Sequence, residues 1–170
     1  PRLPEWEGEF YFEYHRGTYT SIAKNKRSNR KSELMLMDLV LLAVMALHKN
    51  AAYPSDELDA LWKTVLLNQF HDILPGSSIK EVYEVTKKEY ALIKDKATAL
   101  IEDRLEELTD EGEGITIYNT LGFERNDIIN LGESNAAALK DEIGNIYPVQ
   151  QTKEGAVAFV TKIPSKGSKT

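Results

Sequence analysis

A short acidic segment with two glycines, Asp110-Glu-Gly-Glu-Gly114, divides the sequence into two parts with different hydrophobic periods. Before it, apolar residues recur every three or four positions, which is the spacing of one face of an α-helix. From Ile115 to Leu121 the period changes to two, which is typical of a strand. We therefore expect an α+β fold, in which an antiparallel three-helix bundle precedes an incomplete all-β, sandwich-like portion.

These patterns define three regions. Residues 1–19 are an aromatic, extended lead-in, residues 20–110 form the bundle, and residues 111–170 form the β portion. The strand-like pieces of the β portion are separated by turns that contain Gly or Asn, and they cover residues 115–121, 124–131, 145–151 and 156–163. Four short strands make a thin sheet with exposed edges, so this portion is expected to be incomplete.

The first helix is expected over roughly residues 20–49. Its start can be capped by a hydroxyl side chain, that of Thr18, Thr20 or Ser21. Its second half, Leu34–Leu47, is apolar almost all round, so we expect it to be buried on more than one side. Residues 16–32 contain six basic residues and no acidic one. They are best explained as a solvated helix face or one that pairs with acidic surface, and phosphate contact is the alternative.

Two further helices are expected after short connections. The second begins at Ser55 and must end near Leu74, because Pro75 lacks an amide hydrogen and restricts the residue before it. The third begins at Ser78, where Ser78 and Glu81 fit a capping box. Its apolar seam has a coiled-coil-like spacing and comprises Ile79, Val82, Thr86, Tyr90, Ile93, Ala97 and Leu100.

The composition limits the classes of function. Hydrophobic residues make up 42% of the chain and charged residues 28%, which is typical of a soluble globular protein. The net charge of -6 disfavours a general nucleic-acid-binding role. We find no apolar run long enough to span a bilayer and no signal-like segment, and we expect no membrane partner. The absence of cysteine fits a reducing compartment, so we expect a cytoplasmic location. The chain starts at Pro1 and looks cut out of a longer protein.

The first candidate for chemistry is the pair His71-Asp72, at the end of the apolar second helix. With Thr64 and Asn68 it forms a polar stripe, and burial of these side chains is costly unless they have partners. The sequence has no cysteine, so a metal would have to use the 3 histidines and the carboxylates. Imidazole suits zinc, but zinc takes about four ligands, so the others must come from elsewhere. The alternative is an ordinary helix-end pair that is solvated or bonded to nearby backbone.

His15 and Arg16 are a second candidate, because they stand just before Gly17 at the end of the aromatic segment. They are either part of a solvated loop or the polar rim of a ligand pocket, since loops at the ends of rigid elements often carry binding residues.

Four blocks of the sequence resemble one known family. They are EFYFEYHRGTYTS (9–21), NKRSNRKSE (25–33), LWKTVLLNQFHDILPGSSIKEVY (61–83) and ITIYNTLGFER (115–125). Together, and in this order, they resemble family 38 of the glycoside hydrolases, the zinc-dependent α-mannosidases, in their bacterial form. The resemblance runs over about residues 7–131 and is specific because four separate blocks agree.

The resemblance implies a place for each region. Members of the family have an N-terminal α/β catalytic domain, a three-helix middle domain and large C-terminal β domains. Residues 1–19 would then be the tail of the catalytic domain, residues 20–110 the middle domain, and residues 111–170 the start of the C-terminal β domain. The family's nucleophile and general acid are aspartates of the catalytic domain. The resemblance therefore implies no catalytic residue in this chain, which alone would be inactive.

The resemblance also implies a Zn²⁺ site shared with that catalytic domain. The family's zinc is held by two Asp and two His, and one of these His belongs to a histidine-aspartate motif at the end of a bundle helix. That motif matches His71-Asp72, so His71 looks like a zinc ligand and Asp72 like a residue that binds mannose hydroxyls. His15 falls where many relatives carry an aromatic residue beside the sugar. With Arg16 it is expected to contact substrate, and it departs from the family's pattern.

The activity implied is retaining hydrolysis of terminal α-mannosidic linkages, with two carboxylates about 5–5.5 Å apart as nucleophile and acid. The zinc would orient the 2- and 3-hydroxyls of the sugar. The implied partners are an α-mannoside and the catalytic domain of the same parent chain, with no nucleic acid. The alternative from another class is a non-catalytic interaction module made of a helix bundle and a β domain.

Overall fold

The computed structural model describes residues 2–8, 17–109 and 114–170. Residues 9–16 of the expected aromatic lead-in, among them His15 and Arg16, lie outside the described residues. The chain divides into two compact units, and each is described by itself. The units are Pro1–Val40 with Tyr53–Glu102, and Leu41–Ala52 with Asp103–Thr170.

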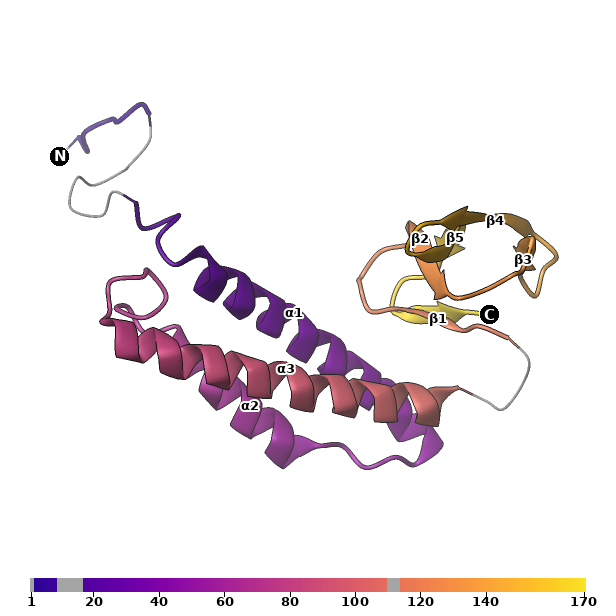
Figure 1. Cartoon of the computed structure of the whole chain (residues 1–170), viewed down its shortest axis with the longest axis horizontal. Coiled ribbons are helices and arrows are strands. Elements are labelled where there is room, and N and C mark those ends of the chain that lie inside the picture. Colours follow the sequence, from indigo (N-terminus) through magenta and orange to yellow (C-terminus); the bar gives the residue numbers. More distant parts are fainter. Residues whose placement is uncertain (1, 9–16, 110–113) are drawn as a thin grey trace. The chain divides into compact units, whose positions relative to one another are not determined.

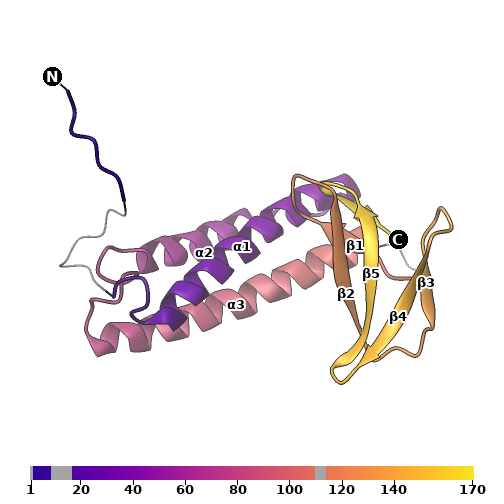
Figure 2. The ribbon, with the colours of Figure 1, turned by 90° about the horizontal axis from the view of Figure 1, so that it is seen from above.

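Three long helices come first in the described chain (Figure 1). Their bounds, with those of a short 3₁₀-helix, are α1 Ala23–Ala46, η2 Leu47–Lys49, α2 Ser55–Asn68 and α3 Lys80–Leu108. α2 lies beside α1 and α3 and runs in the opposite direction to both (Figure 2). The predicted antiparallel three-helix bundle is confirmed.

The bundle core is built from apolar residues at helical spacing on all three helices. Its buried members are Leu36, Leu39, Leu58, Leu61, Val65, Tyr90, Ile93 and Ala97. The seam predicted for the third helix is confirmed at its centre, where Thr86, Tyr90, Ile93 and Ala97 are buried. Ile79 precedes α3 and is 68% exposed, so the seam does not extend that far.

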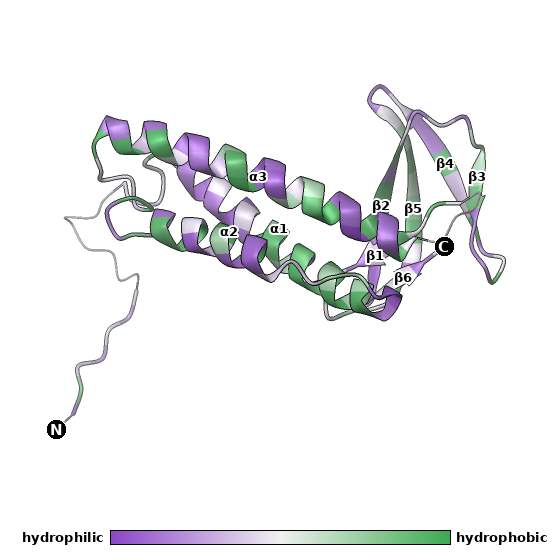
Figure 3. Ribbon diagram, turned by 90° about the horizontal axis from the view of Figure 1, so that it is seen from below, coloured by the Kyte–Doolittle hydropathy of each residue, from purple (hydrophilic) through white to green (hydrophobic). Residues whose placement is uncertain are grey.

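The apolar half of α1 is buried mainly on one side. Leu36 and Leu39 are 0% exposed, whereas Leu34, Met37 and Val44 are 43%, 59% and 45% exposed. Hydrophobic residues therefore continue around this helix beyond the face that packs in the bundle (Figure 3). The prediction of burial on more than one side is wrong for the described chain, because each helix of a three-helix bundle turns only one stripe toward the core.

The prediction that the second helix continues to about Leu74 is also wrong, because α2 ends at Asn68. The chain continues in tight turns, in which Ile73 N–H donates to the Phe70 carbonyl at 2.8 Å and Gly76 N–H to the Ile73 carbonyl at 3.2 Å. Pro75 sets only the last possible end of a helix. After Asn68 the bonding changes from helical to turn-like, since Phe70 N–H donates to the Leu67 carbonyl at 3.1 Å.

The hydroxyl groups expected to cap α1 and α3 bind elsewhere. Thr20 and Ser21 donate to the Gly17 carbonyl at 3.2 and 2.9 Å, within turns that precede α1. Ser78 donates to the Asp72 carbonyl at 2.6 Å, so the predicted capping box is wrong. A hydroxyl group that can cap a helix can also donate to a carbonyl group of a turn. In both places these hydroxyl groups bind the turn and do not cap the helix.

In the described residues of the second unit, six strands form two antiparallel sheets. The strands are β1 Ile117–Asn119, β2 Arg125–Gly132, β3 Ala138–Lys140, β4 Ile146–Thr152, β5 Gly155–Ile163 and β6 Gly167–Lys169. One sheet pairs β1 with β6, and the other has the order β2-β5-β4-β3. The four predicted strand segments are present, and the two short strands β3 and β6 were not predicted.

The β core lies against one face of the larger sheet. Its buried members are Tyr147, Ala158, Val160 and Ile163, and Ile117 of β1 packs against them. On the other face, Ile128 of β2 is paired with Phe159 of β5, and their side chains are 64% and 57% exposed. The β portion thus buries one face of its main sheet within the described chain, and the predicted α+β fold class is confirmed.

Candidate functional site

His71 and Asp72 lie in the turn between α2 and α3, with both side chains toward solvent. The imidazole is 78% exposed and the carboxylate 58%, and His71 Nε2 lies 3.5 Å from Asp72 Oδ2. The ring of Phe70 lies beside the imidazole, with 4.1 Å between the ring centroids. The pair therefore presents a nitrogen and an oxygen ligand next to each other.

The main chain of the turn is bound from the α3 side. Tyr83 of α3 places its hydroxyl 3.3 Å from the Asp72 carbonyl oxygen and 3.2 Å from that of Ile73, and it accepts the N–H of Ser78 at 3.0 Å. The Ser78 hydroxyl donates to the same Asp72 carbonyl. The Tyr83 hydroxyl thus joins the Asp72 and Ile73 carbonyls to the Ser78 amide, next to the His71-Asp72 pair.

The same turn is bound from the α1 side by the first turn of that helix. Asn25 donates its amide Nδ2 to the Ile73 carbonyl at 3.2 Å, and Lys26 donates its ammonium group to the Pro75 carbonyl at 3.1 Å. These bonds join residues 48 and 49 positions apart. The turn is therefore held between two helices by polar contacts to its backbone.

Gly76 closes the turn where it approaches the chain before α1. Its φ is +96°, and a Cβ atom here would lie 2.8 Å from Ser21 Cβ and 3.0 Å from the Ser21 carbonyl oxygen. Both the conformation and the lack of space require glycine. The Pro75-Gly76 pair thus lets the turn pack closely on the α1 side.

A layer of bonded polar side chains lies inside the bundle below the turn. Gln69 donates to Asn29 at 3.0 Å and to Glu33 at 2.8 Å, and Asn68, 1% exposed, donates to Glu89 at 2.8 Å. The predicted polar stripe is therefore divided: Asn68 points into the bundle, and His71 and Asp72 point away from it.

Tyr90 completes this layer. Its hydroxyl donates to Asn29 Oδ1 at 3.4 Å. Burial raises the pKa of Tyr90 to about 12, and the negative charges of Glu33 and Glu89 act in the same direction. The layer thus joins the helices by hydrogen bonds while the phenol of Tyr90 stays neutral.

The apolar side chains near the end of α2 do not hold the turn in place. Leu66 and Phe70 are 59% and 51% exposed, so they do not pack the turn into the core. Asn25, Lys26 and Tyr83 do this work through hydrogen bonds, and sequence reasoning did not identify them. Asn25 and Lys26 belong to the block 25–33, and Tyr83 ends the block 61–83, so membership of the blocks that carried the family resemblance was the available signal.

The described residues hold no group of three or more His, Cys, Asp and Glu side chains that could bind a metal ion. His71 and Asp72 offer one imidazole and one carboxylate, which are both ligands that zinc accepts. Zinc takes about four ligands, so the pair fits this metal only as part of a site that other groups complete. In the part of the chain that the structure describes, no helix is long and apolar enough to cross a bilayer.

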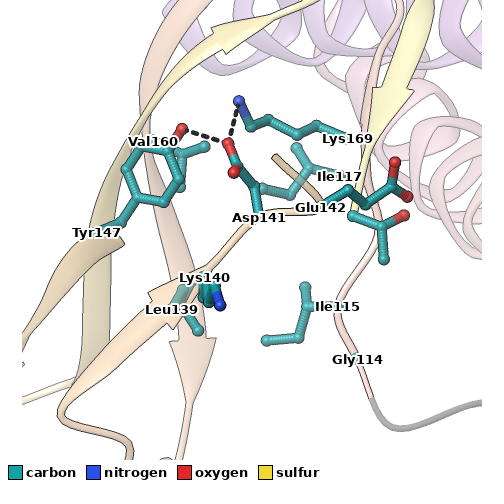
Figure 4. Close-up of a pocket in the computed structure, with 11 residues that line it drawn as sticks. Gly114, Ile115, Ile117, Leu139, Lys140, Asp141, Glu142, Tyr147, Val160 and Lys169 are labelled. Atoms are coloured by element: carbon teal, nitrogen blue, oxygen red, sulfur yellow. Dashed lines mark hydrogen bonds and ion pairs between the residues drawn. The ribbon is translucent and has the colours of Figure 1, made fainter. Parts of the chain in front are cut away.

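A cavity of about 570 Å³ lies in the second unit, lined among others by Ile117, Leu139 and Val160 (Figure 4). On its wall the Asp141 carboxylate accepts bonds from Lys169 and Tyr147, each at 2.9 Å.

Burial by itself raises the pKa of the Asp141 carboxyl. Hydrogen bonds from Asn145, Lys169 and Tyr147 outweigh that effect, so the pKa lies well below its usual range. The carboxylate is saturated with protein donors, and we interpret the cluster as structural, since it joins β6 to the β3–β4 hairpin.

Comparison with known proteins gives a consistent result. A family model described as alpha mannosidase middle domain matches residues 13–108. The chain is 38% identical over 141 residues to human alpha-mannosidase 2C1, covering 80% of this chain and 14% of that protein. It is 52% identical over 85 residues to an alpha-mannosidase of Saccharomyces cerevisiae, covering 48% of this chain and 8% of the yeast protein. The chain thus spans a small part of the relatives it matches.

A solved structure shows the same fold. It is a protein of glycosyl hydrolase family 38 from Enterococcus faecalis, which matches with a TM-score of 0.70 and 18% identity, over 89% of this chain and 24% of that one. An alpha-mannosidase from Enterococcus faecalis V583 matches with a TM-score of 0.68. At this identity the likeness concerns the fold.

Proposed function

The chain belongs to the α-mannosidases of glycoside hydrolase family 38, and from this premise we propose that it is the middle part of an enzyme that hydrolyses terminal α-mannosidic linkages by a retaining mechanism. Its own contribution would be one zinc ligand and one sugar-binding carboxylate. The attacking and protonating carboxylates would come from the catalytic domain of the same parent chain.

The observation that carries this proposal is the exposed pair at the surface of a well-bonded turn. The His71 imidazole and the Asp72 carboxylate are adjacent and open, while the backbone behind them is bound to α1 and α3. A ligand group held on a fixed backbone loses little entropy when it binds. His71 would hold zinc through its imidazole, and Asp72 would accept hydrogen bonds from sugar hydroxyls.

When bound, the zinc ion would supply a Lewis acid that holds sugar hydroxyls in a fixed orientation. The chain's own residues would orient the sugar and hold one ligand in place. His15 and Arg16 would contact the same substrate, and we carry this forward as a proposal because they lie outside the described residues.

The test is the variant His71→Ala in the full-length parent protein. We expect the zinc content, measured by mass spectrometry, to fall, and the hydrolysis of an aryl α-mannoside to fall by at least about 100-fold, because a ligand matters at least as much as the groups that support ligands. His48→Ala is the matched control, because His48 is also exposed but lies in η2.

Near-normal zinc content and activity in His71→Ala would contradict the proposal and favour the non-catalytic interaction module. The isolated chain is expected to hydrolyse no aryl mannoside and to bind zinc weakly. Turnover by the isolated chain would be a second contradiction.

A further inference from the structure

Lys26 uses its ammonium group in an unusual way for a lysine in a basic stretch. Its Nζ atom lies 2.5 Å from the Ser21 carbonyl oxygen and 3.1 Å from the Pro75 carbonyl oxygen. The side chain is half-buried between the first turn of α1 and the turn that carries His71 and Asp72. A charged donor makes stronger hydrogen bonds than a neutral one, so these contacts are suited to fixing a backbone.

The contact belongs to a set that binds three successive parts of the turn to the start of α1. Asn25 binds the Ile73 carbonyl, Lys26 binds the Pro75 carbonyl, and Gly76 packs on Ser21. Lys26 supplies the charged bond of this set. On its far side the turn is bound by Tyr83, so removal of the lysine would weaken the attachment to α1 and leave the contacts of Asn25 and Tyr83 in place.

We propose that Lys26 is a positioning residue for His71 and Asp72, acting through the Pro75 carbonyl to keep the turn in one conformation. The inference rests on the proposed function, because the benefit of a fixed turn is that its two side chains are already placed when zinc and sugar bind. Lys26 touches neither of them. Loss of the Lys26 side chain would allow the turn more conformations. Binding of zinc or sugar would then cost more conformational entropy, because it would have to restrict the turn to one of them.

Substitutions of Lys26 in the full-length parent protein separate this role from charge and from length. Lys26→Met removes the donor and keeps an unbranched side chain that is one atom shorter, and Lys26→Arg keeps a charged donor. Lys24→Met removes the same charge from an exposed neighbour, so it serves as the control. Ile93→Ala, in the bundle core, controls for a general loss of stability.

Two measurements read out the position of the turn without relying on activity. The first is the zinc dissociation constant, from competition with a chelator, which we expect Lys26→Met to raise by about 10–100-fold, as for other residues that support ligands. The second is hydrogen–deuterium exchange of the peptide that contains the Ile73, Leu74 and Gly76 amides, which we expect to become faster. Lys26→Arg should restore both in part, and Lys24→Met and Ile93→Ala should leave zinc affinity near that of the parent.

Unchanged zinc affinity and unchanged exchange in Lys26→Met would overturn the inference. Equal loss of zinc affinity in Ile93→Ala would also overturn it, because the effect would then be general destabilisation. If Lys26→Met does not fold, Lys26→Leu, which also lacks a donor, takes its place with the same expectations. If His71→Ala retains zinc, the proposed function itself fails; if only Lys26→Met retains it, the positioning role alone fails.

Discussion

The hydroxyl of Tyr90 lies 3.4 Å from Oδ1 of Asn29 and joins α3 to α1 inside the bundle. Burial, together with the charges of Glu33 and Glu89, raises the pKa of this tyrosine from 10.0 to about 12. A raised pKa means that the folded state keeps a proton that the unfolded state releases. The stabilisation is complete below pH 10.0 and is lost as the pH rises through about 12.

We therefore expect the free energy of unfolding to fall between pH 10 and 12, and Tyr90→Phe to reduce this dependence. The measurement is urea unfolding of the chain at several pH values, followed by circular dichroism. Tyr53→Phe is the control, since Tyr53 is 38% exposed. An equally steep fall in Tyr90→Phe and in the parent would show that other groups cause it.

Asp141 makes the stability of the β portion depend on pH in the acidic range. Its pKa lies below its usual range because hydrogen bonds from Asn145, Lys169 and Tyr147 outweigh the opposing effect of burial. A lowered pKa contributes stability above the unfolded value of 3.8, and this is lost as the pH falls toward the folded value. We expect Asp141→Asn to destabilise the β portion at pH 7 and to weaken its dependence on acid.

Chemical unfolding of parent and variant at pH 7 and pH 3, followed by amide exchange in the strands, measures this effect. Asp127→Asn is a suitable control, because Asp127 is a partly exposed strand carboxylate. Lys169→Met should destabilise the same strands, since it leaves the buried carboxylate without its cation. Equal stabilities of Asp141→Asn and the parent at pH 7 would contradict the prediction.

The bundle could be predicted from the sequence because its determinants are local. Leu36, Leu61 and Ile93 recur at helical spacing with their neighbours, and in α3 that spacing also indicates the buried face. In α1 it does not, because apolar residues continue around the helix. The two short strands β3 and β6 could not be predicted in the same way. Each has three residues, and β6 exists only through pairing with the distant β1.

The support of the turn has non-local causes. Tyr83 and Asn25 bind the Ile73 carbonyl from 10 and 48 residues away, so no local pattern indicates these contacts. The basic stretch that contains Lys26 was interpreted as a solvated face for the same reason. His71 and Asp72 were identified through the family resemblance, and their binding of zinc and sugar is a prediction.

Gly76 is expected to tolerate no side chain. Gly76→Ala requires a Cβ atom 2.8 Å from Ser21 Cβ and places alanine at a φ of +96°. The conformation alone costs about 1–3 kcal/mol, and the overlap with Ser21 adds to it. Gly17→Ala is the control, because Gly17 has a φ of +84° but its nearest atom, Ser21 Oγ, is 3.8 Å away.

Urea unfolding of both variants should show a larger loss in Gly76→Ala than in Gly17→Ala. Amide exchange should also become faster at Ile73 and Leu74 in the first variant only. Equal losses in the two variants would show that backbone strain, and not the approach to Ser21, requires the glycine.

Ile93 and Leu92 are neighbours in α3 that test the assignment of the core directly. Ile93 is 1% exposed and belongs to the core cluster, whereas Leu92 is 52% exposed. Ile93→Ala should therefore lower the free energy of unfolding by about 2–5 kcal/mol, through lost burial and the cavity that is left. Leu92→Ala changes a surface position and should cost at most about 0.5–1 kcal/mol. Urea unfolding of the two variants measures both free energies, from the midpoint at an unchanged dependence on denaturant. Similar losses of stability in the two variants would mean that α3 packs with a different face toward α1 and α2.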